Sequence, residues 1–356
     1  MAGIYIGQPW GTDPTKLSLR EFTGTAEDYA ALAHIRNETM RAVSLPQDFQ
    51  EMTVQDMVRF YNRGGFTPVG NAWLMFSGQE PVAAGVLYPP ALFQDRPPGN
   101  FDMYVVPALW QHGLGSRLLA HLEQAARARG YPVLETTVAR EDERSTRFLL
   151  NRGFQVVGQS VRLIRPHMRD LPRPDLPQGY AIRSLADLKA PPELYRDTTN
   201  RLGAYDPSYS LITPEDMHSL VESGGWEPDG VLFLFDPFER IVGVIRASTG
   251  TGTVASTGEG SRDDATGMSG YLHEVRLEPA SRGRGLGMVM LAEALRYLAG
   301  AGVDRVQVDT PGENTPAYHL ALKAGFTPVR HWLHFLKRLG DHTRQGAGGQ
   351  SLTTNH

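Results

Sequence analysis

The chain of 356 residues contains no cysteine, which excludes disulfide bonds, thiolate metal sites and cysteine nucleophiles. This absence fits a reducing compartment. The first ten residues lack the basic and apolar segments of a secretory signal peptide. No apolar run approaches the roughly 20 residues that are needed to cross a bilayer. We therefore expect a cytoplasmic protein with no membrane partner.

A strong charge of one sign is lacking as well. The net charge of −4 gives no electrostatic reason to expect nucleic acid or an anionic surface as a partner. The composition, 41% hydrophobic and 21% charged, is ordinary for a globular protein. The length corresponds to about two domains of ~150 residues. We expect two domains, each with its own core.

Two further kinds of site find no support in the sequence. No Gly-x-Ser-x-Gly segment marks a serine hydrolase. His331 and His334 are three positions apart on an expected final strand and would face opposite sides of it, so no metal site is predicted.

An internal repeat is present instead. A proline, a Gly-Leu-Gly triplet and a Gly-Phe pair each recur 172 positions later. The repeated segments are Val105-Val106-Pro107 with Leu277-Glu278-Pro279, Gly113-Leu114-Gly115 with Gly285-Leu286-Gly287, and Gly153-Phe154 with Gly325-Phe326. One constant spacing over three segments indicates two copies of a single domain.

Each copy has the same expected order of elements. Helical segments come first, and a hairpin of two apolar strands follows. The hairpins are expected at 73–76 with 81–87 and at 231–235 with 240–245. In the second copy a strand at 271–277 leads through a glycine turn into a helix, a strand at 303–310 and a short helix before Gly325. This order predicts an α/β fold: a mixed, largely antiparallel sheet flanked by helices.

The domain boundaries follow from composition. Four prolines between Arg165 and Gly179 are incompatible with a helix or a central strand. We therefore expect a first domain at 12–168, a linker at 169–179 and a second domain at 180–340. The polar segment Thr249–Gly270 is expected to be a surface loop, and the Gly-rich residues 341–356 a flexible tail.

The turn Arg282-Gly-Arg-Gly-Leu-Gly287 lies between a strand and a helix. The first N–H groups of a helix lack intrahelical partners, and glycines let the backbone close around a phosphate. A P-loop would continue with Lys-Ser/Thr, and a dinucleotide fingerprint would read G-x-G-x-x-G; neither is present. A ligand that carries a pyrophosphate is expected here.

The pattern Arg-x-x-Gly-x-Gly, after a strand and Pro279 and before a helix, resembles motif A of the GNAT superfamily of acyl-CoA N-acyltransferases. The segment from Asn314 to Gly325-Phe326 is also typical of that family. Thr315 can cap the short helix, Pro316 fits its first turn and Gly325 can end it. The resemblance covers both copies and implies two tandem GNAT-like domains.

The resemblance assigns a site for acetyl-CoA, the cosubstrate. The strand before motif A would bind the pantetheine arm, the glycine turn would hold the phosphates, and Asn314 would contact the end of the pantetheine. The implied residues are Val275, Arg276, Leu277, Arg282, Gly283, Arg284, Gly285, Leu286, Gly287 and Asn314. The counterparts Val105, Gly113 and Gly115 form a possible second site.

The two copies are not equivalent. The first has Trp110 where the motif has Arg or Gln, and Asp142 at the position of Asn314. A carboxylate disfavours an anionic ligand nearby, so we expect a degenerate first domain and catalysis in the second. Tandem members of the family also place catalysis in their C-terminal copy.

The resemblance implies direct transfer to an amine, which needs a base, an oxyanion donor and an acid. Glu274 is the candidate base, with a salt-bridged structural carboxylate as the alternative; its counterpart is Asp102. His273 is expected on the opposite strand face and to be packed. A backbone N–H near Val275 would be the oxyanion donor.

The acid departs from the family pattern. The position where many members carry a tyrosine holds Ala321, and Leu149 in the first copy. Tyr318, about one helical turn earlier, is the candidate acid; water is the alternative, and Tyr318 could equally serve in packing.

The predicted function is an N-acetyltransferase that moves the acetyl group of acetyl-CoA to a primary amine of a small molecule or peptide. One alternative is a non-catalytic acyl-CoA-binding or sensor protein on the same fold. Another is a structural module with an empty glycine turn. A monomer and a homodimer are both compatible with the sequence.

Overall fold

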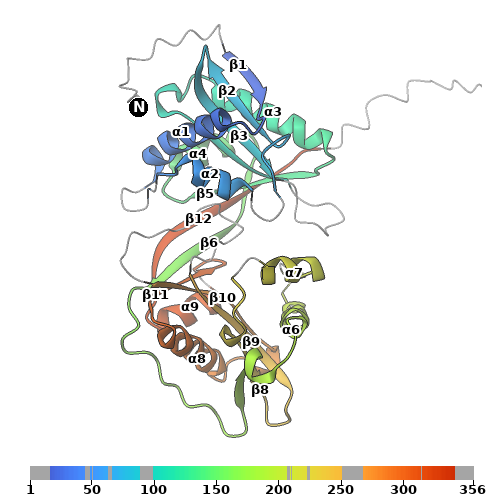
Figure 1. Ribbon diagram of the computed structural model, residues 1–356, viewed down its shortest axis with the longest axis vertical. Helices are drawn as coiled ribbons and strands as arrows, with labels where there is room; N and C mark the ends of the chain where they lie inside the picture. Colours follow the sequence, from blue (N-terminus) through green and yellow to red (C-terminus); the bar gives the residue numbers. More distant parts are fainter. Residues whose placement is uncertain are drawn as a thin grey trace, which may run out of the picture. The chain divides into compact units, whose positions relative to one another are not determined.

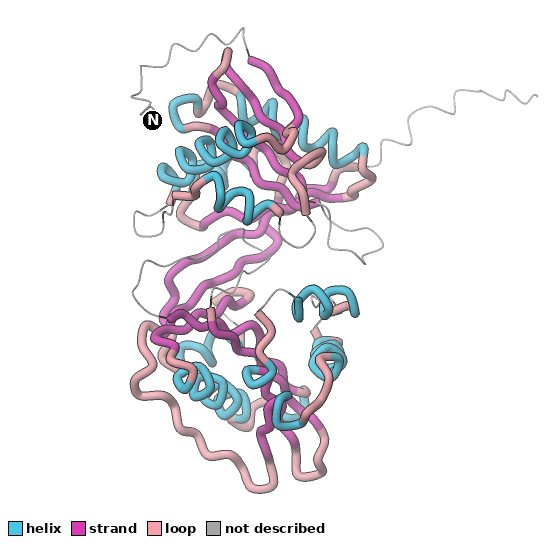
Figure 2. Tube along the Cα trace, in the orientation of Figure 1, coloured by secondary structure: helices cyan, strands magenta, loops and turns pink. Residues whose placement is uncertain are grey.

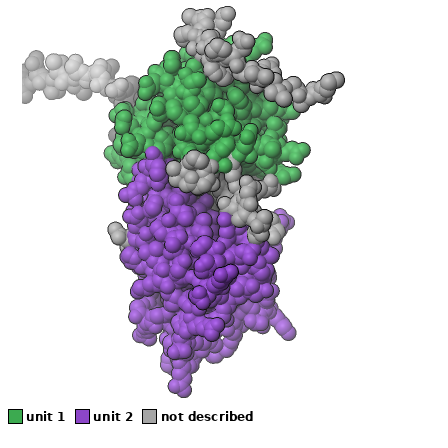
Figure 3. Space-filling model, turned by 90° about the vertical axis from the view of Figure 1, so that its left-hand side faces the viewer, with its two compact units in different colours: residues 1–138, 142–157, 334–356 green, residues 139–141, 158–333 purple. Residues whose placement is uncertain are grey.

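The computed structural model describes residues 17–44, 49, 51–62, 66–88, 99–206, 209, 211–222, 225–250, 268–313 and 315–340. Asn314, most of the expected loop Thr249–Gly270 and the expected tail 341–356 lie outside these residues. The chain forms two compact units (Figure 3). Unit 1 comprises residues 1–138, 142–157 and 334–356, and unit 2 comprises residues 139–141 and 158–333.

Unit 1 is built on a sheet whose first four strands are antiparallel neighbours in chain order. These are β1 (Leu17–Glu21), β2 (Ala72–Ser77), β3 (Glu80–Tyr88) and β4 (Gly99–Val105). β4 then pairs in parallel with β5 (Val133–Ala139). The helices are α1 (Ala26–Val43), α2 (Val54–Tyr61), α3 (Leu114–Ala128) and α4 (Glu143–Leu150), with the short 3-10 helix η2 (Pro107–Leu109) before α3.

Unit 2 has the corresponding sheet, with its strands in the order β6-β11-β10-β9-β8-β7. The strands are β6 (Gln155–Arg165), β7 (Ala181–Ser184), β8 (Val231–Phe235), β9 (Ile241–Thr249), β10 (Met268–Leu277) and β11 (Val303–Thr310). The helices are α5 (Leu185–Leu188), α6 (Glu193–Gly203), α7 (Pro214–Glu222), α8 (Leu286–Gly300) and α9 (Pro316–Lys323), with the 3-10 helices η3 (Pro228–Gly230) and η4 (Pro279–Ser281). Of the pairings β6–β11, β11–β10, β10–β9, β9–β8 and β8–β7 between the described residues, only that of β10 with β11 is parallel. The predicted mixed, largely antiparallel sheet is thus confirmed.

Each unit includes a strand from the other sequence repeat. β6 follows Gly153-Phe154 of the first repeat, yet its residues 161–165 pair with residues 306–310 of β11 within unit 2. β12 (Thr327–Arg338) follows Gly325-Phe326 of the second repeat, and its residues from 334 onward belong to unit 1. There the N–H of Leu339 donates to the carbonyl oxygen of Pro132. The residues between β6 and β7 form neither helix nor strand (Figure 2).

Alternation along β8 builds the two faces of the unit 2 sheet. Leu232 and Leu234 belong to a core cluster with the apolar side of α8, whereas Val231, Phe233 and Phe235 belong to a second cluster with α6 and α7. Figure 1 shows α8 on one side of this sheet and α6 and α7 on the other. Each large side chain buried in this way contributes roughly 1.5–3 kcal/mol.

The structure confirms the repeat at the level of single turns. α3 and α8 each contain 15 residues and begin after a left-handed glycine: Gly113 has φ 82° and Gly285 has φ 78°. Gly153 and Gly325 have φ 81° and 82°. Thr315 caps α9 with Pro316 in its first turn, as predicted. No helix within the described ranges is long and apolar enough to cross a membrane.

Candidate functional site

The glycine turn of unit 2 is open toward solvent. Gly283 and Gly285 have φ 74° and 78°, a region that L side chains rarely adopt. A Cβ atom at either glycine would meet no other atom within 4 Å, and Arg282 to Gly285 are exposed. Gly287 differs, because a Cβ there would lie 3.4 Å from the side chain of Leu320. Two glycines therefore leave room for a ligand, and the third allows α8 to approach α9.

The turn is held in place by Arg282. Its Nε donates to the carbonyl oxygen of Leu277, the last residue of β10, at 3.0 Å. Arg284 is exposed, and the first turn of α8 contains no acidic residue. The unpaired N–H groups and the partial positive charge of a helix N-terminus favour an anion at this position. The turn is therefore suited to the pyrophosphate of acetyl-CoA.

β10 separates from β11 next to this turn. Their pairing ends at Leu272 with Val308, although β10 continues to Leu277. The N–H of Glu278 donates to the carbonyl of Val242 in β9. Because backbone groups alternate in direction along a strand, those of Arg276 point to β9 and those of Val275 point to the side that β11 has left. The backbone groups of Val275 thus point to the side where the pairing with β11 has ended, whereas the carbonyl of Leu277 already accepts from Arg282.

A β-bulge lies at His273. In the pairing of β10 with β9, Tyr271 is opposite Ser248 and Glu274 is opposite Arg246, with a register shift in between. Directly opposed residues share a face, and so do Arg246 and Ser248, two residues apart. Tyr271 and Glu274 therefore face the same side.

The bulge corrects the expectation that His273 faces away from Glu274. The Nε2 of His273 lies 2.8 Å from the Oγ of Ser248, and its ring centroid lies 4.7 Å from that of Tyr271. His273 therefore lies on the face that carries Glu274. Strict period-two alternation failed because the bulge inserts one extra residue.

Glu274 is held in a polar network on the α6 face. The hydroxyl of Tyr195, from α6, donates to Oε1, and Nε of Arg276 donates to Oε2 at 2.9 Å. Nε of Arg246 in turn donates to the oxygen of Tyr195 at 3.2 Å. The ring of Tyr209 packs under the guanidinium of Arg276, at 4.1 Å. Tyr195, Tyr209 and Arg246 were not predicted from the sequence. Tyr195 is on α6, Arg246 is on β9 and Tyr209 follows α6, and none of these segments carries a motif that indicates which residue meets Glu274.

The pKa shifts define which of these groups carry protons. Burial, and next the positive charge of Arg246, lower the pKa of His273 well below its usual value, so the imidazole is neutral near pH 7. Burial, and next the charge of Glu274, raise the pKa of Tyr195 beyond its ordinary range and that of Tyr209 to about 12. Both phenols therefore remain protonated, and Tyr195 is a permanent donor to Glu274.

Tyr318 lies on the other face of the sheet. It is half-buried against the core cluster of α8, which also includes Val275 and Leu320. Its ring contacts that of His319. Ala321, at the position where many GNAT proteins carry a tyrosine, is buried in the same cluster. The structure therefore does not bring Tyr318 into contact with Glu274.

The sequence model of the acetyltransferase (GNAT) family matches residues 30–154 and 200–326, most of both repeats. The chain belongs to this family. It is an acetyltransferase, and acetyl-CoA is its acetyl donor. The open glycines, the anion-favouring start of α8 and the unpaired edge at Val275 fit that donor.

Mycothiol acetyltransferase from Tsukamurella paurometabola is 28% identical over 260 residues, which cover 68% of this chain and 78% of that protein. The protein of the same name from Thermobispora bispora is 27% identical over 254 residues, covering 71% and 79%. Among solved structures, a GCN5-related N-acetyltransferase from Sphaerobacter thermophilus has a TM-score of 0.70 at 18% identity, covering 92% of this chain and 96% of the other. A tandem GNAT protein from the clavulanic acid biosynthesis pathway has a TM-score of 0.62 at 17% identity, covering 91% and 99%. Both structures share the tandem fold.

The corresponding turn of unit 1 keeps its shape but changes its chemistry. Nε1 of Trp110 donates to the carbonyl of Val105 at 2.8 Å, as Arg282 does to Leu277. Gln111 takes the positive φ of Gly283, at 66°, and Gly113 again has nothing within 4 Å of its Cβ position. The guanidinium of Arg144, on α4, lies 4.2 Å from the ring of Trp110. A cation is thus still near this turn, supplied by another element.

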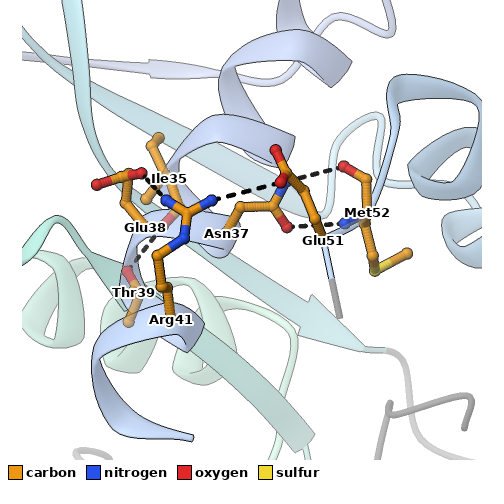
Figure 4. Close-up of polar contacts among 7 residues, drawn as sticks. All are labelled: Ile35, Asn37, Glu38, Thr39, Arg41, Glu51 and Met52. Carbon is orange, nitrogen blue, oxygen red and sulfur yellow. Dashed lines mark hydrogen bonds and ion pairs between the residues drawn. The ribbon is translucent and has the colours of Figure 1, made fainter. Parts of the chain in front are cut away.

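Helix α1 also contacts the end of β4. Oγ1 of Thr39 lies within hydrogen-bond distance of two carbonyl oxygens, that of Val105 at 3.0 Å and that of Ile35 at 2.7 Å. Figure 4 shows the bond between Thr39 and Ile35 and, on the other side of the view, the reciprocal bonds between Asn37 and Met52, which fix α1 to the segment before α2. The Val105 carbonyl is therefore within reach of two side-chain donors in unit 1.

β4 of unit 1 has no bulge opposite β3, and it pairs with β5 only at Gly99 and Asn100. Asp102 accepts from the hydroxyl of Tyr88 at 2.6 Å and is within reach of the hydroxyl of Tyr104 at 3.4 Å. Burial raises the pKa of the Asp102 carboxyl, despite these donors. Asp142 caps α4 by accepting from the N–H of Ser145. Its carboxylate thus has a structural role in unit 1.

The third residue of the possible second site is Gly115. A Cβ atom at this position would lie 3.1 Å from the ring of Phe148 on α4. Like Gly287 in unit 2, Gly115 therefore serves close helix packing.

Proposed function

We propose that unit 2 transfers the acetyl group of acetyl-CoA to a primary amine, with Glu274 as the general base. The observation that supports this most directly is the bulge at His273. It places Glu274 on the α6 face immediately before Val275, where β10 has separated from β11. A base and an unpaired backbone edge thus lie on adjacent residues.

In the proposed reaction acetyl-CoA supplies the acetyl group as a thioester. Glu274 takes a proton from the ammonium form of the acceptor, whose nitrogen then bonds to the acetyl carbon as the carbon–sulfur bond breaks. The Val275 N–H stabilises the negative charge on the carbonyl oxygen. Tyr195 and Arg276 hold the Glu274 carboxylate. The products are an N-acetyl amide and CoA.

The leaving thiolate needs a proton, and the nitrogen loses its second proton as the amide forms, so the group that protonates the sulfur can regain its proton from the nitrogen. Tyr318 is our candidate donor, and water is the alternative. Tyr318→Phe separates them: a loss of turnover with unchanged affinity for acetyl-CoA supports Tyr318, and unchanged turnover supports water. The variant keeps the aromatic ring in the α8 cluster, so the packing is preserved.

The function is tested with the purified chain, acetyl-CoA and a panel of primary amines. Released CoA is measured with a thiol reagent, to which the cysteine-free protein gives no background. Mass spectrometry of the acceptor detects the acetyl group on nitrogen. Equal amounts of CoA and N-acetyl product support the proposal. Binding of acetyl-CoA without transfer to any amine would contradict it.

We further propose that the functional acetyl-CoA site is in unit 2 alone. Unit 2 has two arginines in its turn and the bulged strand, whereas unit 1 has Trp110 in its turn and a regular strand. Titration with acetyl-CoA should therefore show one site per chain; two sites would contradict this assignment.

A further inference from the structure

The charges around Glu274 are unbalanced. On this side of the unit 2 sheet, Arg276 pairs with Glu274, and Arg162 pairs with Asp309 through two bonds of 2.9 and 3.0 Å. Arg246 remains. It bonds the phenol oxygen of Tyr195, and no carboxylate within the described part of the chain forms an ion pair with it.

Arg246 is also positioned close to the proposed base. It lies directly opposite Glu274 on the neighbouring strand, where paired Cα atoms are about 4.5–5.5 Å apart. The side chain is half-buried, and its charge is one cause of the lowered pKa of His273. A half-buried guanidinium without a carboxylate is costly unless an anion joins it.

This arrangement does not match an acceptor that carries only positive charge. Among the described residues, Arg276 and Arg162 each pair with a carboxylate here whereas Arg246 does not, and the neutral His273 adds no charge. A polyamine or a lysine-rich peptide would bring further cations next to Arg246, which forms no ion pair within the described part of the chain. An acceptor with an anionic group would instead complete the pairing, and guanidinium binds carboxylate and phosphate through two parallel bonds.

We propose that the acceptor is a small amine that also bears an anionic group, a carboxylate or a phosphate, and that Arg246 binds this group while Glu274 receives the amine. The inference rests on the proposed function, because it uses Glu274 as the place of the amine. The short distance between the two strand positions requires the anion to lie only a few bonds from the amine.

The test compares acceptors that differ only in the anion. β-Alanine is paired with β-alaninamide, and O-phosphoethanolamine is paired with ethanolamine. We expect kcat/KM to be about tenfold to a hundredfold higher for one anionic member than for its neutral partner. The pair that shows the preference identifies the anion as carboxylate or phosphate. Equal values within both pairs would overturn the inference and leave the proposed function intact.

Variants then assign the preference to Arg246. Arg246→Met should bring the ratio of kcat/KM within each pair to about one, whatever its effect on the absolute rate through Tyr195, and Arg246→Lys should restore part of the ratio, since a point charge lacks the paired geometry. Arg183→Met is the control, because Arg183 lies on β7 and forms an exposed ion pair with Glu239, in the turn between β8 and β9. A preference that survives in Arg246→Met would reject Arg246 as the binding group.

Binding measurements keep the two proposals separable. If the wild-type protein acetylates no amine, the proposed function fails, and the anion inference is decided by titration of the CoA-saturated protein with each pair. Tighter binding of an anionic member that Arg246→Met abolishes would support the inference. Equal affinities within both pairs would overturn it.

Discussion

The turns of the two units have the same shape but carry different charge. Arg282 and Trp110 each donate a side-chain N–H to the carbonyl at the end of the preceding strand, at 3.0 and 2.8 Å. The next turn residue has a positive φ in both, as Gly283 and as Gln111. The geometry therefore needs a donor at this position, and the residue need not be an arginine. A neutral tryptophan makes the same bond as Arg282, so the turn does not need the positive charge of Arg282. We therefore attribute this charge to an interaction with a ligand.

The strands before these turns differ more than the residues suggest. Asp102 and Glu274 are 172 positions apart, like the glycines. Yet β10 contains a bulge opposite β9, and β4 is regular opposite β3. Glu274 is held by Tyr195 and Arg276, whereas Asp102 is buried with a raised pKa. Asp102 and Glu274 thus occupy equivalent positions in the repeat, although the strand pairing differs between the two units.

The largest expected difference between the units comes from their cap glycines. Gly285→Leu should abolish binding of acetyl-CoA, because a side chain would fill the space next to the first N–H groups of α8. Gly113→Leu is a matched control: its φ of 82° and open surroundings impose the same strain of about 1–2 kcal/mol. Calorimetric titration decides, and equal losses in both variants would show that both units bind acetyl-CoA.

The two strand carboxylates should differ next. Glu274→Gln should lower kcat by at least about a hundredfold, because the amide cannot accept the proton. The affinity for acetyl-CoA should stay within about twofold, since Glu274 is hydrogen-bonded to α6, whereas α8, which follows the turn, packs on the other face of the sheet. Asp102→Asn in unit 1 should leave kcat nearly unchanged. An unaltered rate in Glu274→Gln would make Glu274 a structural carboxylate.

The phenols that bond these carboxylates give a smaller effect. Tyr195→Phe should lower kcat by about tenfold with little change in the KM for acetyl-CoA, because one charge-assisted bond to Glu274 is lost. Tyr88→Phe removes the equivalent bond to Asp102 and should leave kcat unchanged. Similar reductions in both variants would point to a general loss of stability.

The smallest effect concerns stability and pH. Burial raises the pKa of Asp102 above its ordinary value of 3.8, so the folded state holds this proton to a higher pH than the unfolded chain does. The contribution of this group is then fully present below 3.8 and is lost as pH rises through the folded pKa. Asn cannot ionise, so only the wild type should lose stability as pH rises. The melting temperature of Asp102→Asn minus that of the wild type should therefore increase from pH 4 to pH 7.

Each kcal/mol of unfolding free energy shifts the melting temperature by about 2–4 °C in a domain of this size, and we expect a change of that order. Calorimetry of the full chain at both pH values provides the measurement. A difference between the two proteins that is independent of pH would contradict the raised pKa.

Much of the fold could be predicted from local patterns. β8 and β11 begin and end at the predicted residues, because a bounded apolar run (β8) and valines that recur between polar residues (β11) both indicate strands. The caps of α9 were predicted from Thr315, Pro316 and Gly325, since each has a preferred backbone role. These features depend on residues that are close together in the chain, so they can be predicted from a single sequence.

The network around Glu274 could not be predicted in the same way. Tyr195 is 79 positions away from Glu274, and no residue near it indicates that it would reach β10. The neutral state of His273 also depends on burial and on Arg246, neither of which is visible in the sequence. Long-range contacts of this kind require the packed structure.

The sequence by itself determined the repeat, the class of sheet and the two glycine turns, because glycine, proline and apolar spacing constrain the backbone locally. Only the tertiary structure decided three other features: the bulge at His273, the partners of Glu274, and the placement of β6 within unit 2. The Gly-Phe pairs that precede β6 and β12 are identical, so the sequence alone does not say which sheet each strand joins. Register and strand pairing depend on which edge offers hydrogen-bond partners and which face is buried, and both conditions exist only once the sheet has formed.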